Sequence, residues 1–157
     1  PLRRPHPPPS DSQLHHLQLE SNLIQSGGLS AIASALRSNV ALSSLSLRLN
    51  DLSSGGARPL AESFLFNAHL RELDLGETRL GDEGAVLLGK ALGNNHGLTR
   101  LALPKNGIGD LGALAIADGL ARNRRLLQLE LQQNRISEGG VTALQNAMAV
   151  SAVHTLR

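Results

Sequence analysis

The sequence repeats itself every 28 residues, and five consecutive copies fit that step without an insertion or a deletion. Each copy opens on the pattern Leu-x-x-Leu-x-Leu-x-x-Asn, and the copies start at residues 14, 42, 70, 98 and 126. Thr78 replaces the Asn in the third copy. A unit this short cannot bury its own apolar residues, so adjacent units must stack. The repeat therefore predicts an elongated stack of similar units rather than a globule around one central core.

Each unit contains two different hydrophobic periods. The opening Leu-x-Leu alternation has a period of two, which predicts a short strand with one buried face. A second apolar set follows at the i, i+3, i+4, i+7 spacing of an amphipathic helix, as in Leu29, Ile32, Ala33 and Leu36. Stacked units then form a parallel sheet, and the wider helices bend the stack. We expect an α/β arc with the sheet on the concave side and the helices on the convex side.

Further columns of the repeat mark the ends of these elements. One position holds short polar side chains, which we expect to cap the helix of their own copy: Ser26, Ser54, Asp82 and Asp110. Two residues later comes a glycine in every copy, which requires either a special backbone angle or a close approach: Gly28, Gly56, Gly84, Gly112 and Gly140. A second asparagine column closes the helices, where Asn tolerates turn conformations: Asn39, Asn67, Asn95 and Asn123. Pro59 should delay or kink the second helix.

The composition excludes several classes of protein. The chain has no cysteine, so it can form neither a disulfide nor a thiolate metal site. No apolar run approaches the roughly 18 residues that a membrane span needs, and no signal peptide opens the chain. Basic and acidic residues alternate and the formal charge is only +2, which argues against a nucleic-acid surface. We therefore expect a cytoplasmic protein that contacts neither nucleic acid nor membrane.

The repeat also divides the chain. Residues 1–13 are rich in proline, which is typical of a disordered leader, whereas residues 14–157 form the predicted repeat domain. The pattern Val153-x-x-Leu156 resembles the opening of a sixth repeat that arrives one residue early. A start at Pro-Leu-Arg-Arg without Met, and an end without a polar cap, predict that the chain is a fragment of a longer protein.

The copies LRELDLGETRLGDEGAVLLGKAL (residues 70–92) and LTRLALPKNGIGDLGALAIADGL (residues 98–120) resemble the ribonuclease-inhibitor-like class of leucine-rich repeats. The resemblance covers residues 14–157 and implies a horseshoe-shaped solenoid that binds another protein. Ribonuclease inhibitor, the sensor regions of NOD-like receptors and Ran GTPase-activating proteins belong to this class. The chain lacks the cysteines of the first, the upstream phosphate loop of the second and the acidic tail of the third, so no functional residue transfers from them.

In this architecture the solvent-facing strand positions form a concave wall, which is the candidate partner-binding surface. It is polar and carries charges of both signs: Arg48, Glu72, Asp74, Glu77, Arg100, Lys105, Gln128 and Glu130. Adjacent strands lie about 4.8 Å apart, so Glu72 with Arg100 and Glu77 with Lys105 also fit ordinary lateral ion pairs. Both interpretations of these charges stay open at this stage.

No catalytic, cofactor-binding or metal-binding set emerges from the sequence. The glycines of Gly107-x-Gly109-x-x-Gly112 fall on repeat positions rather than on a nucleotide-binding turn. We therefore expect a non-enzymatic protein-interaction scaffold, such as the binding or sensor region of a NOD-like-receptor-type protein. A regulator of a small GTPase, similar to Ran GTPase-activating proteins, and a structural spacer are the alternatives.

Overall fold

A computed structural model describes residues 14–53 and 55–157 of the chain. The predicted Pro-rich leader (residues 1–13) and Ser54 lie outside the described residues. The strands are β1 (His16–Gln18), β2 (Ser44–Ser46), β3 (Glu72–Asp74), β4 (Arg100–Ala102), β5 (Gln128–Glu130) and β6 (Thr155–Leu156). The helices are α1 (Ser26–Ser38), α2 (Ala57–Ser63), α3 (Gly81–Leu92), α4 (Asp110–Arg122) and α5 (Glu138–Met148).

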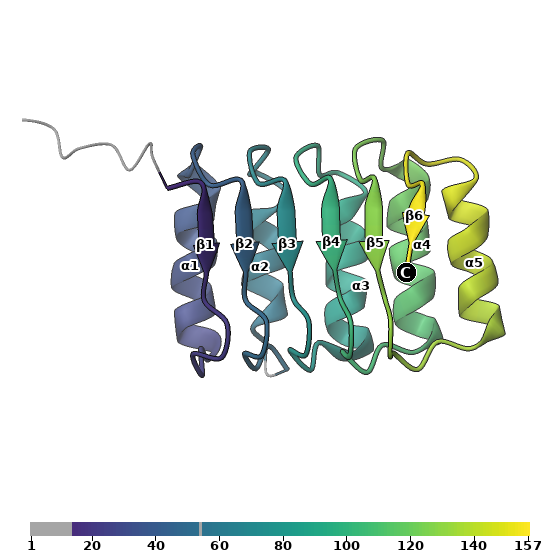
Figure 1. The fold of residues 1–157 in the computed structure, drawn as a ribbon, viewed down its shortest axis with the longest axis horizontal. Helices are drawn as coiled ribbons and strands as arrows, with labels where there is room; N and C mark the ends of the chain where they lie inside the picture. Colours follow the sequence, from purple (N-terminus) through teal and green to yellow (C-terminus); the bar gives the residue numbers. More distant parts are fainter. Residues whose placement is uncertain (1–13, 54) are drawn as a thin grey trace, which may run out of the picture.

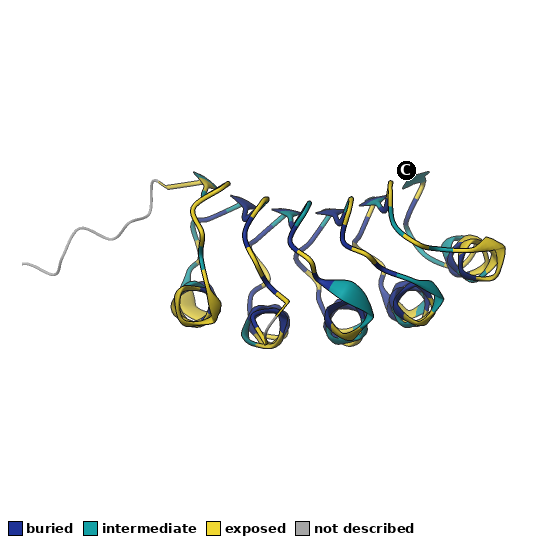
Figure 2. Ribbon diagram, turned by 90° about the horizontal axis from the view of Figure 1, so that it is seen from below, coloured by how far each residue is buried: buried dark blue, intermediate teal, exposed yellow. Residues whose placement is uncertain are grey.

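The strands form one parallel sheet in chain order, with a helix between each pair of neighbours (Figure 1). The register from β1 to β5 joins residues 28 positions apart, as in Leu45 with Leu73, whereas Leu129 pairs with Leu156 after only 27 positions. Seen from below, the strands lie along the inner side of a shallow arc and the helices along its outer side (Figure 2). The predicted α/β solenoid is confirmed.

The core lies between the sheet and the helices and consists of the leucine columns. The second Leu of the opening pattern is buried in the inner copies, at Leu45, Leu73, Leu101 and Leu129. Helix residues at the predicted apolar positions, such as Leu60, Leu88 and Ile116, pack against them. One continuous row of mostly aliphatic contacts, with Phe64 as its aromatic member, therefore forms the core.

Two asparagine ladders join the copies, one where the strands end and one where the helices lead back into the strands. Asn106, at the strand-to-helix edge, donates from Nδ2 to the Leu75 carbonyl (2.7 Å) and accepts at Oδ1 from the amides of Thr78 (3.0 Å) and Leu80 (3.1 Å). Its side chain therefore satisfies backbone groups of the preceding copy as well as bonding within its own. The buried polar backbone of each loop depends on the next repeat.

The second ladder lies at the helix-to-strand edge and corrects one expectation. Asn123, which ends α4, has φ −79° and ψ 136°, so it does not adopt a left-handed turn conformation. Its Nδ2 instead donates to the carbonyls of Leu92 (2.7 Å) and Asn95 (2.9 Å) in the preceding copy. Its Oδ1 accepts from the amide of Leu126 (2.7 Å) at the start of the next. Hydrogen bonding between repeats, rather than turn geometry, explains this column.

The predicted helix caps are also corrected, because the aspartates cap the helix of the following copy. Asp82 Oδ1 accepts from the amides of Gly109 (2.7 Å) and Gly112 (3.0 Å) at the start of α4. The carboxylate of Asp110 accepts in the same way from the amide (2.8 Å) and hydroxyl (2.6 Å) of Ser137, which precedes α5. A carboxylate at these positions supplies both the missing acceptors and a favourable charge for the helix N-terminus.

The same contacts explain the glycine column. A Cβ atom on Gly112 would lie 2.7 Å from Asp82 Oδ1 and 2.8 Å from Ala85 Cβ. A Cβ atom on Gly140 would lie 2.6 Å from Asp110 Oδ1. Of the two reasons left open by the sequence, close approach is the correct one, because neither glycine has a positive φ. Any side chain at these positions would push the capping carboxylate away.

The predicted effect of Pro59 is confirmed. Helix α2 begins only at Ala57. When the repeats are aligned, this start lies three positions later than the start of α4 at Asp110, and α2, at 7 residues, is the shortest helix of the described chain. Pro59 falls in its first turn, where an amide hydrogen has no intrahelical partner to lose.

The capping bonds of Asp110 predict a pH dependence of stability. Hydrogen bonds from the Ser137 hydroxyl, the Ser137 amide and the Gly140 amide lower the pKa of Asp110 below its ordinary value of 3.8. Since the folded-state pKa is the lower one, the ionised carboxylate stabilises the fold above about pH 4, and this stabilisation is lost as the pH falls through the folded pKa. We expect the urea midpoint of the wild type to exceed that of Asp110→Asn at about pH 6 and to converge on it towards about pH 2.

Asp51 gives no competing signal in that comparison. Its pKa is also lowered, by hydrogen bonds from Ser53 and by Arg79, but it is present in both proteins. A difference between the two midpoints that stays constant over the whole pH range would show that the Asp110 cap does not depend on ionisation.

Candidate protein-binding surface

The strands place alternate side chains on the concave surface of the sheet. In β3, Leu73 points into the core and is 1% exposed, whereas Glu72 and Asp74 on either side of it face outwards. Because β1 to β5 keep the same register, equivalent outward residues lie side by side, as Glu72 and Arg100 do. The repeat itself therefore assembles a regular polar wall from five strands.

Strands β1 to β5 each leave the sheet through a residue in the left-handed region, which the sequence did not reveal. Glu77 has φ 58° and Lys105 has φ 55°, and the same angle recurs at Ser21, Leu49 and Gln133. Glycine usually occupies such positions, and none of these copies has one there. The only feature of the sequence that could have indicated this conformation is its fixed position, immediately before the Asn position of each repeat. The turn brings two charged side chains to the lower rim of the wall.

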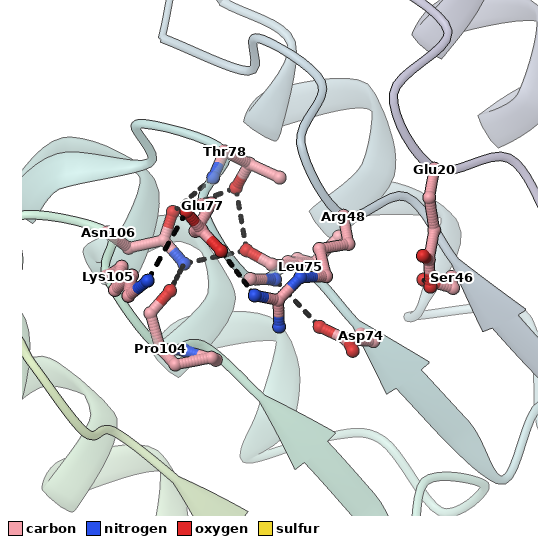
Figure 3. Close-up of polar contacts among 11 residues, drawn as sticks. Glu20, Ser46, Arg48, Asp74, Leu75, Glu77, Thr78, Pro104, Lys105 and Asn106 are labelled. Carbon is pink, nitrogen blue, oxygen red and sulfur yellow. Dashed lines mark hydrogen bonds and ion pairs between the residues drawn. The ribbon is translucent and has the colours of Figure 1, made fainter.

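The first charged cluster is built around Glu77 (Figure 3). Its two carboxylate oxygens contact different cations: Oε1 accepts from Arg48, and Oε2 lies 3.6 Å from Lys105 Nζ. Arg48 reaches Glu77 across Gly76, where a Cβ atom would lie 3.2 Å from the Arg48 guanidinium. The absence of a side chain at Gly76 therefore opens the path for an ion pair that joins β2 to the end of β3.

The second charged cluster is built around Arg100 on β4. Its Nη2 and Nε atoms donate to Glu130 Oε1 on β5, at 2.8 and 3.1 Å. Gln128 donates to the same oxygen at 2.8 Å, and Glu72 lies 3.9 Å from Arg100 on the opposite side. Because the Glu130 side chain is only 14% exposed, this pair is the better shielded of the two contacts of Arg100.

Seven of the eight candidate residues therefore gather into these two clusters. Asp74 stays outside both and accepts from the amide of Gly76 at 2.8 Å. The lateral pairs Glu72–Arg100 and Glu77–Lys105 exist, but the shortest contacts are the diagonal ones of Arg48 and Arg100. Sequence reasoning missed the bond from Ser46 Oγ to Glu20 (2.8 Å), because neither residue stood out by its type.

The described residues show neither a metal site nor a membrane-spanning helix. Among residues 14–53 and 55–157, no three His, Asp or Glu side chains converge in a way that could hold a metal ion. In the same part of the chain, no helix is both long and apolar enough to cross a membrane. What the wall presents is a broad, regular array of fixed charges. That is the class of repeat protein whose sheet forms an interaction surface.

The sequence also matches a known family of repeat proteins. A sequence profile described as Leucine Rich repeat matches residues 12–33, 38–61, 66–89 and 94–117, which together exceed half of the chain. The chain belongs to the leucine-rich repeat family, and it is a protein-interaction domain of that type. No curated protein matches the sequence.

Solved structures share the fold, and two of them illustrate the likeness. One is Leiomodin-1 Actin-Binding Site 2 (ABS2); it has 19% sequence identity and a TM-score of 0.76, and the match covers 90% of this chain and 82% of that one. The other is the tropomodulin C-terminal domain of Caenorhabditis elegans, with 16% identity, a TM-score of 0.74, and coverage of 90% and 86%. At these identities the likeness establishes the architecture alone.

Proposed function

We propose that this chain is the binding or sensor region of a cytoplasmic leucine-rich-repeat protein of the ribonuclease-inhibitor-like, NOD-like-receptor type, and that its concave wall contacts the partner. The residues that we assign to the contact are Arg48, Glu72, Asp74, Glu77, Arg100, Lys105, Gln128 and Glu130. The domain assigned to this task is residues 14–157, built from five repeats and the start of a sixth.

The observation that carries the proposal is the fixed position of the charges on the wall. Glu77 is held between two cations, and Arg100 is held by Glu130. Ordering a long side chain at an interface typically costs about 0.5–1.5 kcal/mol, and side chains that are already held lose less freedom when a partner binds. The wall is therefore preorganised for contact, although each exposed pair adds only about 0–1 kcal/mol to the stability of the fold.

The pattern of charge also indicates the chemistry of the partner. Glu72 and Asp74 expose acidic groups at the centre of the wall, while Arg48 and Lys105 flank Glu77 at its rim. A complementary surface must therefore present both cations and carboxylates in a matching order. Such complementarity favours one binding register and faster association more than it raises affinity.

The experiment compares capture of cytosolic proteins by three forms of the chain. The first is the wild type, and the second is Glu72→Lys/Asp74→Lys/Arg100→Glu on the wall. The third is a control with the same change of net charge away from the sheet face, Glu83→Lys/Glu138→Lys/Arg58→Glu, whose residues are all exposed. Circular dichroism first establishes that all three are folded. We expect mass spectrometry to find a protein retained by the wild type and the control and lost with the wall variant.

Identical capture lists for all three forms would overturn the assignment of the wall and favour a structural spacer. Two purified probes sharpen the result. Actin is one, because the leiomodin-1 structure that shares this fold is an actin-binding site. A small GTPase is the other: a faster rate of GTP hydrolysis in the presence of the chain would support the alternative role of a GTPase regulator.

A further inference from the structure

A group of basic side chains lies along the edge where the helices lead back into the strands, which is the upper edge in Figure 1. We call it the basic edge, and it consists of Arg71, Lys90, Arg122, Arg124 and Arg125. Arg71, Arg124 and Arg125 belong to the loops that precede β3 and β5, and Lys90 and Arg122 belong to the last turns of α3 and α4. All of these side chains except Arg71, which is half-buried, are exposed.

The loop arginines of the basic edge are not neutralised by carboxylates of the described chain. The loops 64–71, 93–99, 123–127 and 149–154 contain no Asp and no Glu. Within the described part of the chain, Arg122 pairs with Asp118 at 2.9 Å, but no carboxylate lies within salt-bridge distance of Arg71, Arg124 or Arg125. On the concave wall, by contrast, every basic side chain has an acidic partner. Arg71, Arg124 and Arg125 therefore keep their charge, whereas Arg122 is paired with Asp118.

The arginines of the edge are held in place through backbone carbonyls. Arg71 Nη1 donates to the carbonyls of Ala68 (2.9 Å) and Gly97 (2.7 Å), and Arg125 Nε donates to that of His96 (3.2 Å). Because Arg125 uses Nε, its two terminal nitrogens stay available as donors within the described structure. These two atoms form the fork that binds a carboxylate with two parallel hydrogen bonds. The guanidinium of Arg125 is therefore held in place while its two terminal nitrogens can still donate to a ligand.

Exposed aliphatic side chains lie beside these arginines. Leu127, two residues after Arg125, is 40% exposed. Val150 is 57% exposed, and its backbone carbonyl accepts a hydrogen bond from Arg124. The loops 93–99, 123–127 and 149–154, which surround Arg124 and Arg125, contain no Phe, Tyr or Trp, whereas the exposed Phe66 of the loop 64–71 lies under the Arg37 guanidinium, 4.9 Å from its ring centroid. Proteins that bind single-stranded nucleic acid stack bases on a series of aromatic rings, and the loops around Arg124 and Arg125 offer none. Cations mixed with aliphatic groups fit a peptide that carries both carboxylates and apolar side chains.

We propose that the basic edge is a second docking surface, which binds an acidic segment of a partner protein with aliphatic residues among its carboxylates. The surface is separate from the concave wall, so the two assignments stand or fall independently. The Arg125 fork and Arg124 bind carboxylates of the segment, Arg71 and Lys90 extend the favourable potential along the edge, and Leu127 and Val150 contact its aliphatic side chains.

The test is a fluorescence-anisotropy titration with a labelled ten-residue peptide made of glutamates and three leucines. Arg124→Gln/Arg125→Gln keeps an amide donor at each position and removes two charges; we expect the Kd to rise about tenfold. Arg79→Gln/Arg135→Gln removes the same charge from exposed residues of the opposite edge and should change the Kd less than about twofold. Binding to the wild type should also weaken between about 50 and 300 mM salt.

One more variant guards against loss of the fold. No described bond involves the Lys90 side chain, so Lys90→Gln leaves the loops untouched and should raise the Kd about twofold. Three results would overturn the proposal: no measurable binding of the peptide to the wild type, equal changes for the two double variants, or tighter binding of a ten-nucleotide oligothymidylate than of the peptide. A concave-wall variant that binds the peptide normally separates this surface from the proposed function.

Discussion

Asn106→Ala is expected to lower the free energy of unfolding by about 3–5 kcal/mol. The Asn106 side chain is 2% exposed and serves Leu75, Thr78 and Leu80 in the preceding copy. An alanine leaves two buried amides without an acceptor and removes one donor from a carbonyl, and each unsatisfied buried group costs roughly 1–3 kcal/mol. The Leu75 carbonyl retains a bond from the Thr78 hydroxyl (2.8 Å), so its loss is partial. Urea denaturation followed by far-UV circular dichroism measures the change.

Asn94→Ala is the matched control for this prediction. Asn94 is exposed and its amide makes only a long bond of 3.4 Å to the Lys90 carbonyl. Its replacement should change stability by no more than about 0.5 kcal/mol. If Asn106→Ala costs less than about 1 kcal/mol, the amide is replaceable by solvent, and the idea that the ladder is needed to satisfy buried backbone is wrong.

Gly119→Ala is expected to cost about 3 kcal/mol or more, because α3 and α4 touch through their backbones. A Cβ atom on Gly119 would lie 2.1 Å from the Gly89 carbonyl oxygen, and a Cβ atom on Gly89 would lie 2.3 Å from the Ala115 carbonyl oxygen. Neither oxygen belongs to a side chain that can rotate away, so the two helices must separate. Overpacking of a core by a single carbon typically costs about 1–3 kcal/mol, and rigid backbone places this site at or above the upper end.

The control for Gly119 is a helical glycine with open space around it. A Cβ atom on Gly27 in α1 would meet nothing within 4 Å, so Gly27→Ala should stabilise the protein by about 0.5–1 kcal/mol through helix propensity. Equal effects of the two substitutions in a denaturation experiment would mean that the α3–α4 contact yields easily. Opposite signs would confirm that the close approach, and not glycine in a helix as such, sets the cost.

The sequence predicted the strands, the helices and the buried leucines, because those depend on patterns within one repeat. It assigned Asp82 to the wrong helix, because a column of aspartates looks the same whether each residue caps its own copy or the next. The packing of the first turn of α3 against the start of α4 decides between the two, and only the folded backbone supplies it. The ladder formed by Asn123 was misjudged for the same reason, since its partners lie one repeat away.

For the candidate surface, the sequence predicted which residues share the wall but not which of them bond to each other. Spacing predicted the lateral pairs, such as Glu72 with Arg100. The shorter contacts depend on side-chain length. An arginine can reach past the residue that it pairs with in register to an acid two residues further along the next strand, as Arg100 reaches Glu130. The left-handed conformation of Glu77 also went unseen, since no glycine marks that position. Partner binding by these residues remains a proposal.

The bonds between copies run in both directions along the chain. Asp82 supports the helix that comes after it, whereas Asn106 supports the loop that comes before it. No internal repeat is therefore complete on its own, and separating two neighbours breaks bonds that belong to both. In a linear array the energy of each interface then outweighs that of each unit, and such an array melts as one cooperative block rather than from its ends inwards.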